Sequence, residues 1–92
     1  MSTIDQQEAL ENRRKRLIYQ SHYRGVKEND IILGRFAQNH VHDLDAQALD
    51  DYEKLLQQRD NDIYDWLAGR EPVPAEFDTP VMRLLLKFKV VE

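Results

Sequence analysis

The segment Ser21-His22-Tyr23-Arg24-Gly25-Val26-Lys27-Glu28-Asn29-Asp30 separates two helical patterns and decides how the chain folds back on itself. Gly25 follows the first pattern directly. We expect it to end that helix as a left-handed C-cap, because glycine takes a positive φ without a steric cost. Glu28 and Asp30 fall in the first turn of the next helix, where carboxylates oppose the helix dipole. The segment predicts a tight corner with Arg24 and two carboxylates around it; an ordinary cap on a solvated turn is the simpler alternative.

The rest of the chain predicts further helices on both sides of this corner, because apolar residues recur at helical spacing. The expected helices are 3–23, 27–41, 45–58, 61–68 and a fifth that begins at Thr79-Pro80. No alternating strand pattern extends beyond a few residues. We therefore expect residues 1–92 to form one all-α domain, a compact five-helix bundle in which residues 1–9 fray.

Several residues have expected local roles at the helix ends. Asp45 is expected to cap the third helix, and Asp60 or Asn61 the fourth, which Gly69 ends. Gly34 lies inside the second helix, where it costs about 1 kcal/mol relative to alanine. Close packing against another helix would offset that cost.

The composition indicates a small binding protein rather than an enzyme. The 92 residues are 41% hydrophobic and 33% charged, which is a globular balance. They include no cysteine, which excludes disulfides, thiolate metal sites and cysteine catalysis. His40 and His42 do not share a helix face, so no metal site is expected. No Ser/His/Asp set or glycine-rich phosphate loop is present, and a chain this short has little room for a cofactor pocket.

Charge is distributed unevenly along the chain. Residues 10–36 carry a net charge of +4 and residues 37–80 a net charge of −8. This asymmetry suggests oriented docking on a partner, and the alternative is two solvated faces. The run Arg13-Arg14-Lys15-Arg16 invites a nucleic-acid interpretation. Cations toward a helix C-terminus explain the same run more simply.

The start of the chain, Met1-Ser2-Thr3-Ile4-Asp5-Gln6, has no apolar stretch of a secretory signal. No apolar run in the sequence approaches the length of a membrane span. We therefore expect a cytoplasmic protein that does not insert into a membrane.

The corner also carries a family resemblance. Arg24-Gly25-Val26-Lys27-Glu28 resembles the RGxxE signature of the SdhE family, known in mitochondria as succinate dehydrogenase assembly factor 2. The residues that follow the signature agree with it: Asp30, Leu33, Gly34 and Phe36. A second block is similar as well: Tyr52, Leu55, Leu56, Asp60, Asp62, Ile63 and Trp66. The similarity covers about residues 13–89.

The resemblance implies a compact helical fold and a specific function. Members act as assembly factors for the flavoprotein subunit of succinate dehydrogenase, and of fumarate reductase in some bacteria. They promote covalent attachment of FAD to a histidine of that subunit. The implied protein is not an enzyme: the client holds FAD and supplies the chemistry, and this chain binds no cofactor stably. Separately from the resemblance, we expect a monomer when free, because an exposed corner with charged residues suits a transient partner surface.

The resemblance also assigns expected roles at the corner. Arg24 would contact a carboxylate or carbonyl of the client, since its planar fork makes paired hydrogen bonds. Gly25 would permit close backbone approach, and Glu28 would orient Arg24 or meet a client cation. The rim of this partner-binding site would comprise Ser21, His22, Tyr23 and Asp30. The alternative remains a small helical nucleic-acid-binding or regulatory protein that uses Arg13–Arg16.

Overall fold

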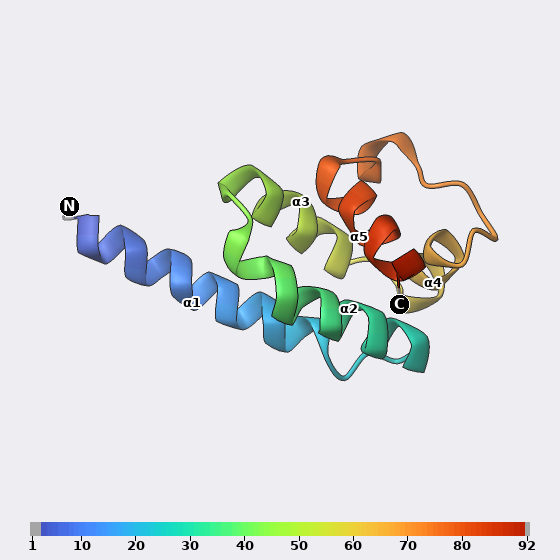
Figure 1. Cartoon of the computed structure of the whole chain (residues 1–92), viewed down its shortest axis with the longest axis horizontal. Helices are drawn as coiled ribbons and strands as arrows, with labels where there is room; N and C mark the ends of the chain where they lie inside the picture. Colours follow the sequence, from blue (N-terminus) through green and yellow to red (C-terminus); the bar gives the residue numbers. More distant parts are fainter. Residues whose placement is uncertain (1–2, 92) are drawn as a thin grey trace.

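The computed structural model describes the backbone of residues 3–91 and the side chains of residues 8–88. The described chain forms five α-helices and two short 3-10 turns (Figure 1). They are α1 (Thr3–Ser21), α2 (Lys27–His40), η1 (Val41–Asp43), α3 (Ala46–Leu56), α4 (Asp60–Leu67), η2 (Ala75–Phe77) and α5 (Pro80–Val91). The predicted all-α class and compact five-helix bundle are confirmed. The expected fraying of residues 1–9 stays a prediction, because the first seven side chains lie outside the described residues.

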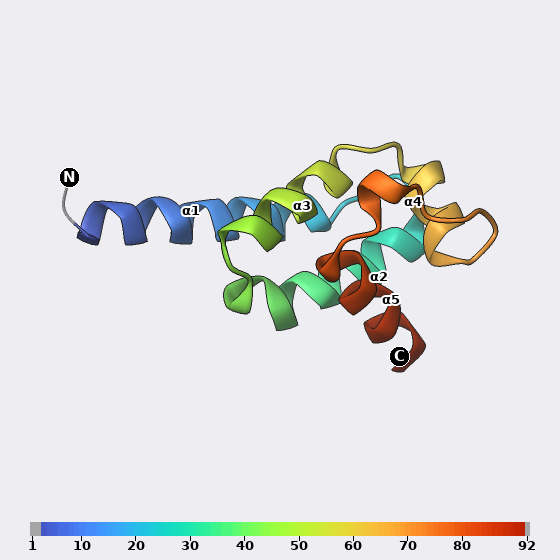
Figure 2. The ribbon, with the colours of Figure 1, turned by 90° about the horizontal axis from the view of Figure 1, so that it is seen from above.

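The first two helices lie antiparallel, and the corner between them sits near the middle of the molecule. Figure 1 shows the N-terminal half of α1 extending away from the body, while α2 returns beside its C-terminal half. Figure 2 shows the same extension of α1 from above, with α3 beside the C-terminal half of α1 and α4 toward the opposite end of the molecule. The molecule measures 46 × 26 × 24 Å, and its length comes from this extension of α1.

All five helices contribute side chains to one apolar core. Its fully buried members include Leu17, Leu33, Phe36, Leu49, Tyr52, Ile63 and Leu85. Full burial of each such side chain contributes roughly 1.5–3 kcal/mol. Of these, α1 supplies only Leu17, so this helix is held to the body over its last turns and by polar contacts.

The helix ends expected at Asp45, Gly69 and Thr79 are confirmed. The Asp45 carboxylate accepts a hydrogen bond from the Ala48 N–H (2.9 Å), and the Thr79 hydroxyl accepts one from the Met82 N–H (3.2 Å). Gly69 follows α4 with a φ of 74°, the left-handed conformation predicted for a C-cap. None of the described helices combines the length and apolar character that a membrane crossing needs.

The loop between α4 and α5 is anchored by aromatic stacking. The Trp66 and Phe77 rings stack with centroids 5.2 Å apart. This contact ties the η2 turn back onto α4, and it explains why a proline-containing connection remains ordered.

Candidate functional site

The corner between α1 and α2 is built around a strained tyrosine. Tyr23 has a φ of 60°, in the left-handed region that costs a non-glycine residue about 1–2 kcal/mol. Its backbone N–H donates to Asp30 Oδ1 over 2.6 Å, which holds this conformation. Gly25 does not have a positive φ, so the predicted glycine C-cap is wrong. Helix α1 ends at Ser21 rather than residue 23 because the chain turns at Tyr23.

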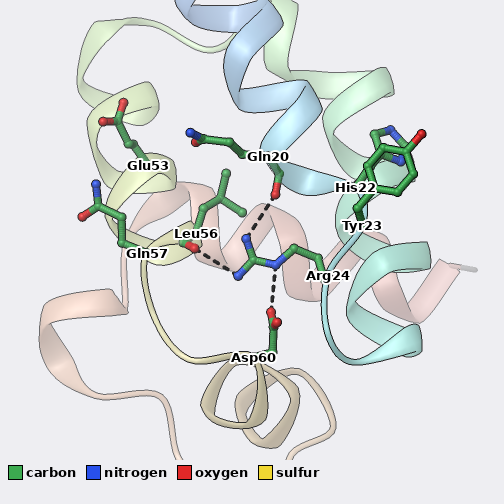
Figure 3. Close-up of a pocket in the computed structure, with 8 residues that line it drawn as sticks. All are labelled: Gln20, His22, Tyr23, Arg24, Glu53, Leu56, Gln57 and Asp60. Atoms are coloured by element: carbon green, nitrogen blue, oxygen red, sulfur yellow. Dashed lines mark hydrogen bonds and ion pairs between the residues drawn. The ribbon is translucent and has the colours of Figure 1, made fainter.

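The guanidinium of Arg24 is directed into the protein and joins three elements (Figure 3). Its Nε donates to Asp60 Oδ1 (2.8 Å), Nη1 to the Gln20 carbonyl (3.1 Å) and Nη2 to the Leu56 carbonyl (3.0 Å). Both carbonyls lie in final helical turns, where unpaired oxygens and the helix dipole favour a cation. The Arg24 side chain is only 12% exposed. A direct contact with a client, as predicted, would require breaking some of these bonds.

Asp60 completes the corner, and sequence reasoning missed this role. Its Oδ1 accepts from Arg24, and its Oδ2 accepts from the Gly25 backbone N–H over 2.8 Å. Burial tends to raise the pKa of Asp60. The hydrogen bonds from the Gly25 N–H and the Arg24 guanidinium lower this pKa by more than burial raises it, so the net shift is downward. The N-cap of α4 is Arg59, which makes no side-chain capping bond. The predicted capping role is therefore wrong for Asn61, which lies inside α4, and for Asp60, whose carboxylate turns back toward the corner.

At Gly25 the structure shows a close approach by Asp60, while an approach by a client stays a prediction. A Cβ at Gly25 would lie 3.0 Å from Asp60 Oδ2, closer than nearly all such contacts. Glu28 is exposed, and Asp60, rather than Glu28, holds Arg24. The prediction that Glu28 orients Arg24 is therefore wrong, while a contact between Glu28 and a client cation stays a prediction.

Ser21 belongs to the core beneath the corner rather than to its rim. It is fully buried, and its hydroxyl lies 2.8 Å from the Leu17 carbonyl and 2.6 Å from the Tyr52 hydroxyl. A serine hydroxyl has one proton, which goes to the carbonyl, so Tyr52 donates to Ser21. Burial raises the pKa of Tyr52 far above its ordinary value, against the opposing effect of the Arg24 charge.

His22 packs into a notch that Gly34 leaves on α2. A Cβ at Gly34 would lie 2.6 Å from His22 Cε1 and 2.7 Å from His22 Nδ1. The partner in this close packing is thus a side chain of the corner rather than another helix. The His22 Nε2 atom also lies 3.4 Å from the Gln38 amide nitrogen. Gly34 therefore positions the half-buried ring of His22 next to Tyr23.

Two tyrosines form the outward surface of the corner. Tyr19 is 70% exposed and Tyr23 82%, and their ring centroids are 5.9 Å apart. Tyr19 was missed, because an exposed aromatic residue in a polar helix gives no periodic signal. Beside them lies an open hollow of about 400 Å³ (Figure 3). Its lining residues are Gln20, His22, Tyr23, Arg24, Glu53, Leu56, Gln57 and Asp60.

The three arginines of the basic run in α1 contact other residues of the protein, while Lys15 is exposed. Arg13 contacts Asp50 (2.6 Å) and Glu53 (3.3 Å), and Arg16 contacts Glu53 (3.0 Å). Arg14 donates to the Leu44 carbonyl over 3.0 Å. The basic and acidic regions of the sequence therefore compensate each other across α1 and α3, which weakens the nucleic-acid interpretation.

The histidines of the second helix and its following turn lie in different surroundings. His40 packs against the Phe36 ring (centroids 5.0 Å apart), whereas His42 Nδ1 lies 3.9 Å from a Glu11 oxygen. Within the described part of the chain, no three histidine, cysteine, aspartate or glutamate side chains gather as a metal site would require.

Comparison with known proteins shows which family the chain belongs to. Residues 15–89 match the family model described as the flavinator of succinate dehydrogenase. This match covers most of the chain and includes the whole corner and Asp60. The chain belongs to the flavinator of succinate dehydrogenase family. The resemblance to the SdhE family is thereby confirmed.

Two curated relatives are named as assembly factors of succinate dehydrogenase. "Succinate dehydrogenase assembly factor 2, mitochondrial" of Dictyostelium discoideum is 47% identical over 76 residues, which are 83% of this chain and 54% of that protein. "Succinate dehydrogenase assembly factor 2-A, mitochondrial" of Drosophila yakuba is 44% identical over 82 residues, 87% of this chain and 51% of that protein. The chain spans about half the length of the curated relatives it matches.

The comparisons correct the expected compartment. The relatives from Dictyostelium and Drosophila that this flavinator family member matches are named as mitochondrial proteins. Their names point to the mitochondrion rather than the cytoplasm, so the cytoplasmic prediction is wrong. That prediction depended on the first residues of the chain, which do not decide a compartment when the relatives are about twice as long as the matched segment.

Proposed function

We propose that this chain is an assembly factor that binds the flavoprotein subunit of succinate dehydrogenase and promotes covalent attachment of FAD to it. Membership of the flavinator family supports the proposal, as do the names of the relatives, which are succinate dehydrogenase assembly factors. The partner-binding surface proposed here is the outward side of the corner: Tyr19, Tyr23, Gly25 and Glu28.

The observation that carries the proposal is the fixed geometry of this corner. Arg24 and Asp60 tie the chain between α1 and α2 to the ends of α3 and α4, while Tyr23 and Gly25 remain exposed. A surface that is ordered before binding loses less conformational entropy when it binds. Such a surface also discriminates between client conformations, and a partner that binds one conformation better shifts the client toward it.

In this proposal the chemistry belongs to the client. The flavoprotein subunit holds FAD and supplies the histidine to which the flavin becomes attached. The assembly factor binds as a monomer and stabilises the client conformation in which that histidine and the flavin meet. The flavoprotein subunit of fumarate reductase is a second client that the same surface would serve.

The test is in-gel flavin fluorescence of the denatured flavoprotein subunit, since only covalently bound flavin survives a denaturing gel. Cells with and without the chain are compared, together with Gly25→Arg. Ala46→Arg is the matched control, because it adds the same side chain at an exposed position at the start of α3, away from the corner. We expect the signal to fall without the chain and with Gly25→Arg, and to persist with Ala46→Arg.

Two results would contradict the proposal. If the amount of covalent flavin is unchanged in the absence of the chain, the chain is not an assembly factor for this subunit. If a folded Gly25→Arg protein gives the normal amount of covalent flavin, the surface that binds the client is not at the corner. The same gel, run on the fumarate reductase flavoprotein, decides whether that subunit is a second client.

A further inference from the structure

We infer that Asp60 is the positioning residue of the partner-binding corner, holding Arg24 and Gly25 in the arrangement that the flavoprotein subunit recognises. Arg24 then acts from inside the protein by shaping the corner, and the exposed side of Gly25 and the Tyr23 ring meet the partner. This inference rests on the proposed function, which is tested separately above.

The two oxygens of Asp60 have different tasks. Oδ1 holds the Arg24 side chain at 2.8 Å, and Oδ2 holds the Gly25 backbone at 2.8 Å. One carboxylate therefore fixes a side chain and the adjacent peptide group at the same time. A Cβ at Gly25 would lie 3.0 Å from Oδ2, so the backbone can approach this carboxylate closely only because residue 25 is glycine.

Asp60 is itself held in place by a buried neighbour. The fully buried Asn29 donates from Nδ2 to the Asp60 backbone carbonyl over 2.7 Å. Asn29 lies in the first turn of α2, so the start of α4 is bonded to both sides of the corner. The arrangement fixes residues 24–29 relative to α4 through bonds that span more than 30 residues of sequence.

The position of Asp60 favours a positioning role over a purely structural one. Its side chain is 27% exposed, whereas the apolar core is fully buried beneath it. Without the carboxylate, the Arg24 guanidinium keeps its bonds to the Gln20 and Leu56 carbonyls, so its burial stays compensated in part. Loss of the carboxylate is therefore expected to loosen residues 23–26 without unfolding the helices.

The experiment measures binding and folding of the same variants. Asp60→Asn keeps the shape and removes the charge, and Asp60→Ser is too short to reach Arg24. Asp62→Asn is the matched control, since it removes the same charge from the same turn of α4 at an exposed position. Affinity for the purified flavoprotein subunit is measured by calorimetry at a temperature at which circular dichroism shows each variant folded.

We expect Asp60→Asn and Asp60→Ser to weaken binding roughly tenfold or more, as removal of charge-assisted hydrogen bonds does. Asp62→Asn should bind like the wild type. The Gly25 amide proton, observed by NMR, should shift upfield in both Asp60 variants and not in the control. Asp60→Glu keeps both acceptor oxygens and should restore part of the affinity.

The inference is overturned if a folded Asp60→Asn protein binds with wild-type affinity. It is also overturned if both variants fail to fold, because Asp60 would then be part of the folding core. Failure of the wild-type chain to bind the flavoprotein subunit would instead contradict the proposed function. The two failures are therefore distinguishable.

Discussion

Tyr23 combines a backbone conformation that glycine adopts more easily with a highly exposed aromatic ring. Its φ of 60° is held by the hydrogen bond to Asp30, and its ring is 82% exposed beside Tyr19. Strained residues that persist in a fold concentrate at functional sites. Tyrosine is also enriched among residues that contribute most to protein interfaces. Both facts favour Tyr23 as a partner contact.

Replacing Tyr23 by glycine tests the role of the aromatic ring separately from that of the left-handed backbone. The relief of about 1–2 kcal/mol of left-handed strain is offset in part by the roughly 0.5–1 kcal/mol that glycine loses in chain entropy. The free energy of unfolding of Tyr23→Gly should therefore stay within about 1 kcal/mol of the wild type, measured by urea titration. Affinity for the flavoprotein subunit should nevertheless fall roughly tenfold, as for an interface anchor.

The control for Tyr23→Gly is Ile31→Ala, which removes another exposed apolar side chain, on α2. It should leave the affinity unchanged. If Tyr23→Gly binds as the wild type does, the ring is not part of the interface, and the strain at residue 23 serves only the turn.

The sequence indicates Arg24 and Gly25 as site residues, but it does not indicate their hydrogen bonds to Asp60. The signature residues are adjacent in the chain, so a local pattern reveals them. The partner of Arg24 is Asp60, which lies 36 residues away, and no periodicity links the two positions. Asp60 also fits the ordinary pattern of a helix cap, and that local explanation concealed its contact with the corner.

Gly34 allows the α2 helix to accept the ring of His22. In a free helix, alanine at this position would be favoured by about 1 kcal/mol. In the protein, the added Cβ would lie within 2.7 Å of two atoms of the ring. The ring and the helix are therefore coupled, and a double-mutant cycle measures the coupling.

In a His22→Ala background, Gly34→Ala should raise the free energy of unfolding by about 1 kcal/mol, because only helix propensity remains. In the wild-type background the same change should give a smaller gain or a loss, because the ring must move. Urea unfolding of the four proteins gives both values. Equal effects of Gly34→Ala in the two backgrounds would show that His22 does not occupy this notch in solution.

The helices themselves were predictable, while their ends and short turns were less so. Apolar spacing gave all five helices, because each buries one stripe in a common core. The 3-10 turns η1 and η2 are only three residues long and have no periodic signal. Helix α4 starts at Asp60 rather than residue 61, because the Arg59 carbonyl already accepts a helical hydrogen bond from the Ile63 N–H.

Across the whole molecule, opposite charges of distant segments meet on the surface between α1 and α3. The arginines of α1 lie against the acidic residues of α3, through Arg13 with Asp50 and Arg16 with Glu53. Charge counting along the sequence detected both regions but not that they face each other. Relative placement of α1 and α3 depends on the corner, and the corner depends on contacts that are distant in sequence.

The acid stability of the molecule should reflect the Asp60 carboxylate. Its pKa in the folded protein lies below the ordinary value of 3.8, because the Gly25 and Arg24 bonds outweigh the effect of burial. A carboxylate with a lowered folded pKa stabilises the folded state above its unfolded pKa, and this contribution is lost as the pH falls through the folded value. The stabilising effect is therefore present at neutral pH and disappears in strong acid.

Asp60→Asn should accordingly lower the free energy of unfolding by roughly 1–3 kcal/mol at pH 7, the range for loss of a hydrogen bond to a charged group. The difference from the wild type should shrink below about pH 4, as protonation makes the aspartate resemble the amide. Urea unfolding at pH 7, 5, 4 and 3, with Asp62→Asn as the control for net charge, measures this difference. A constant gap between wild type and Asp60→Asn across this range would mean that the amide fits the corner poorly for reasons of shape, and that the charge of Asp60 does not hold Arg24.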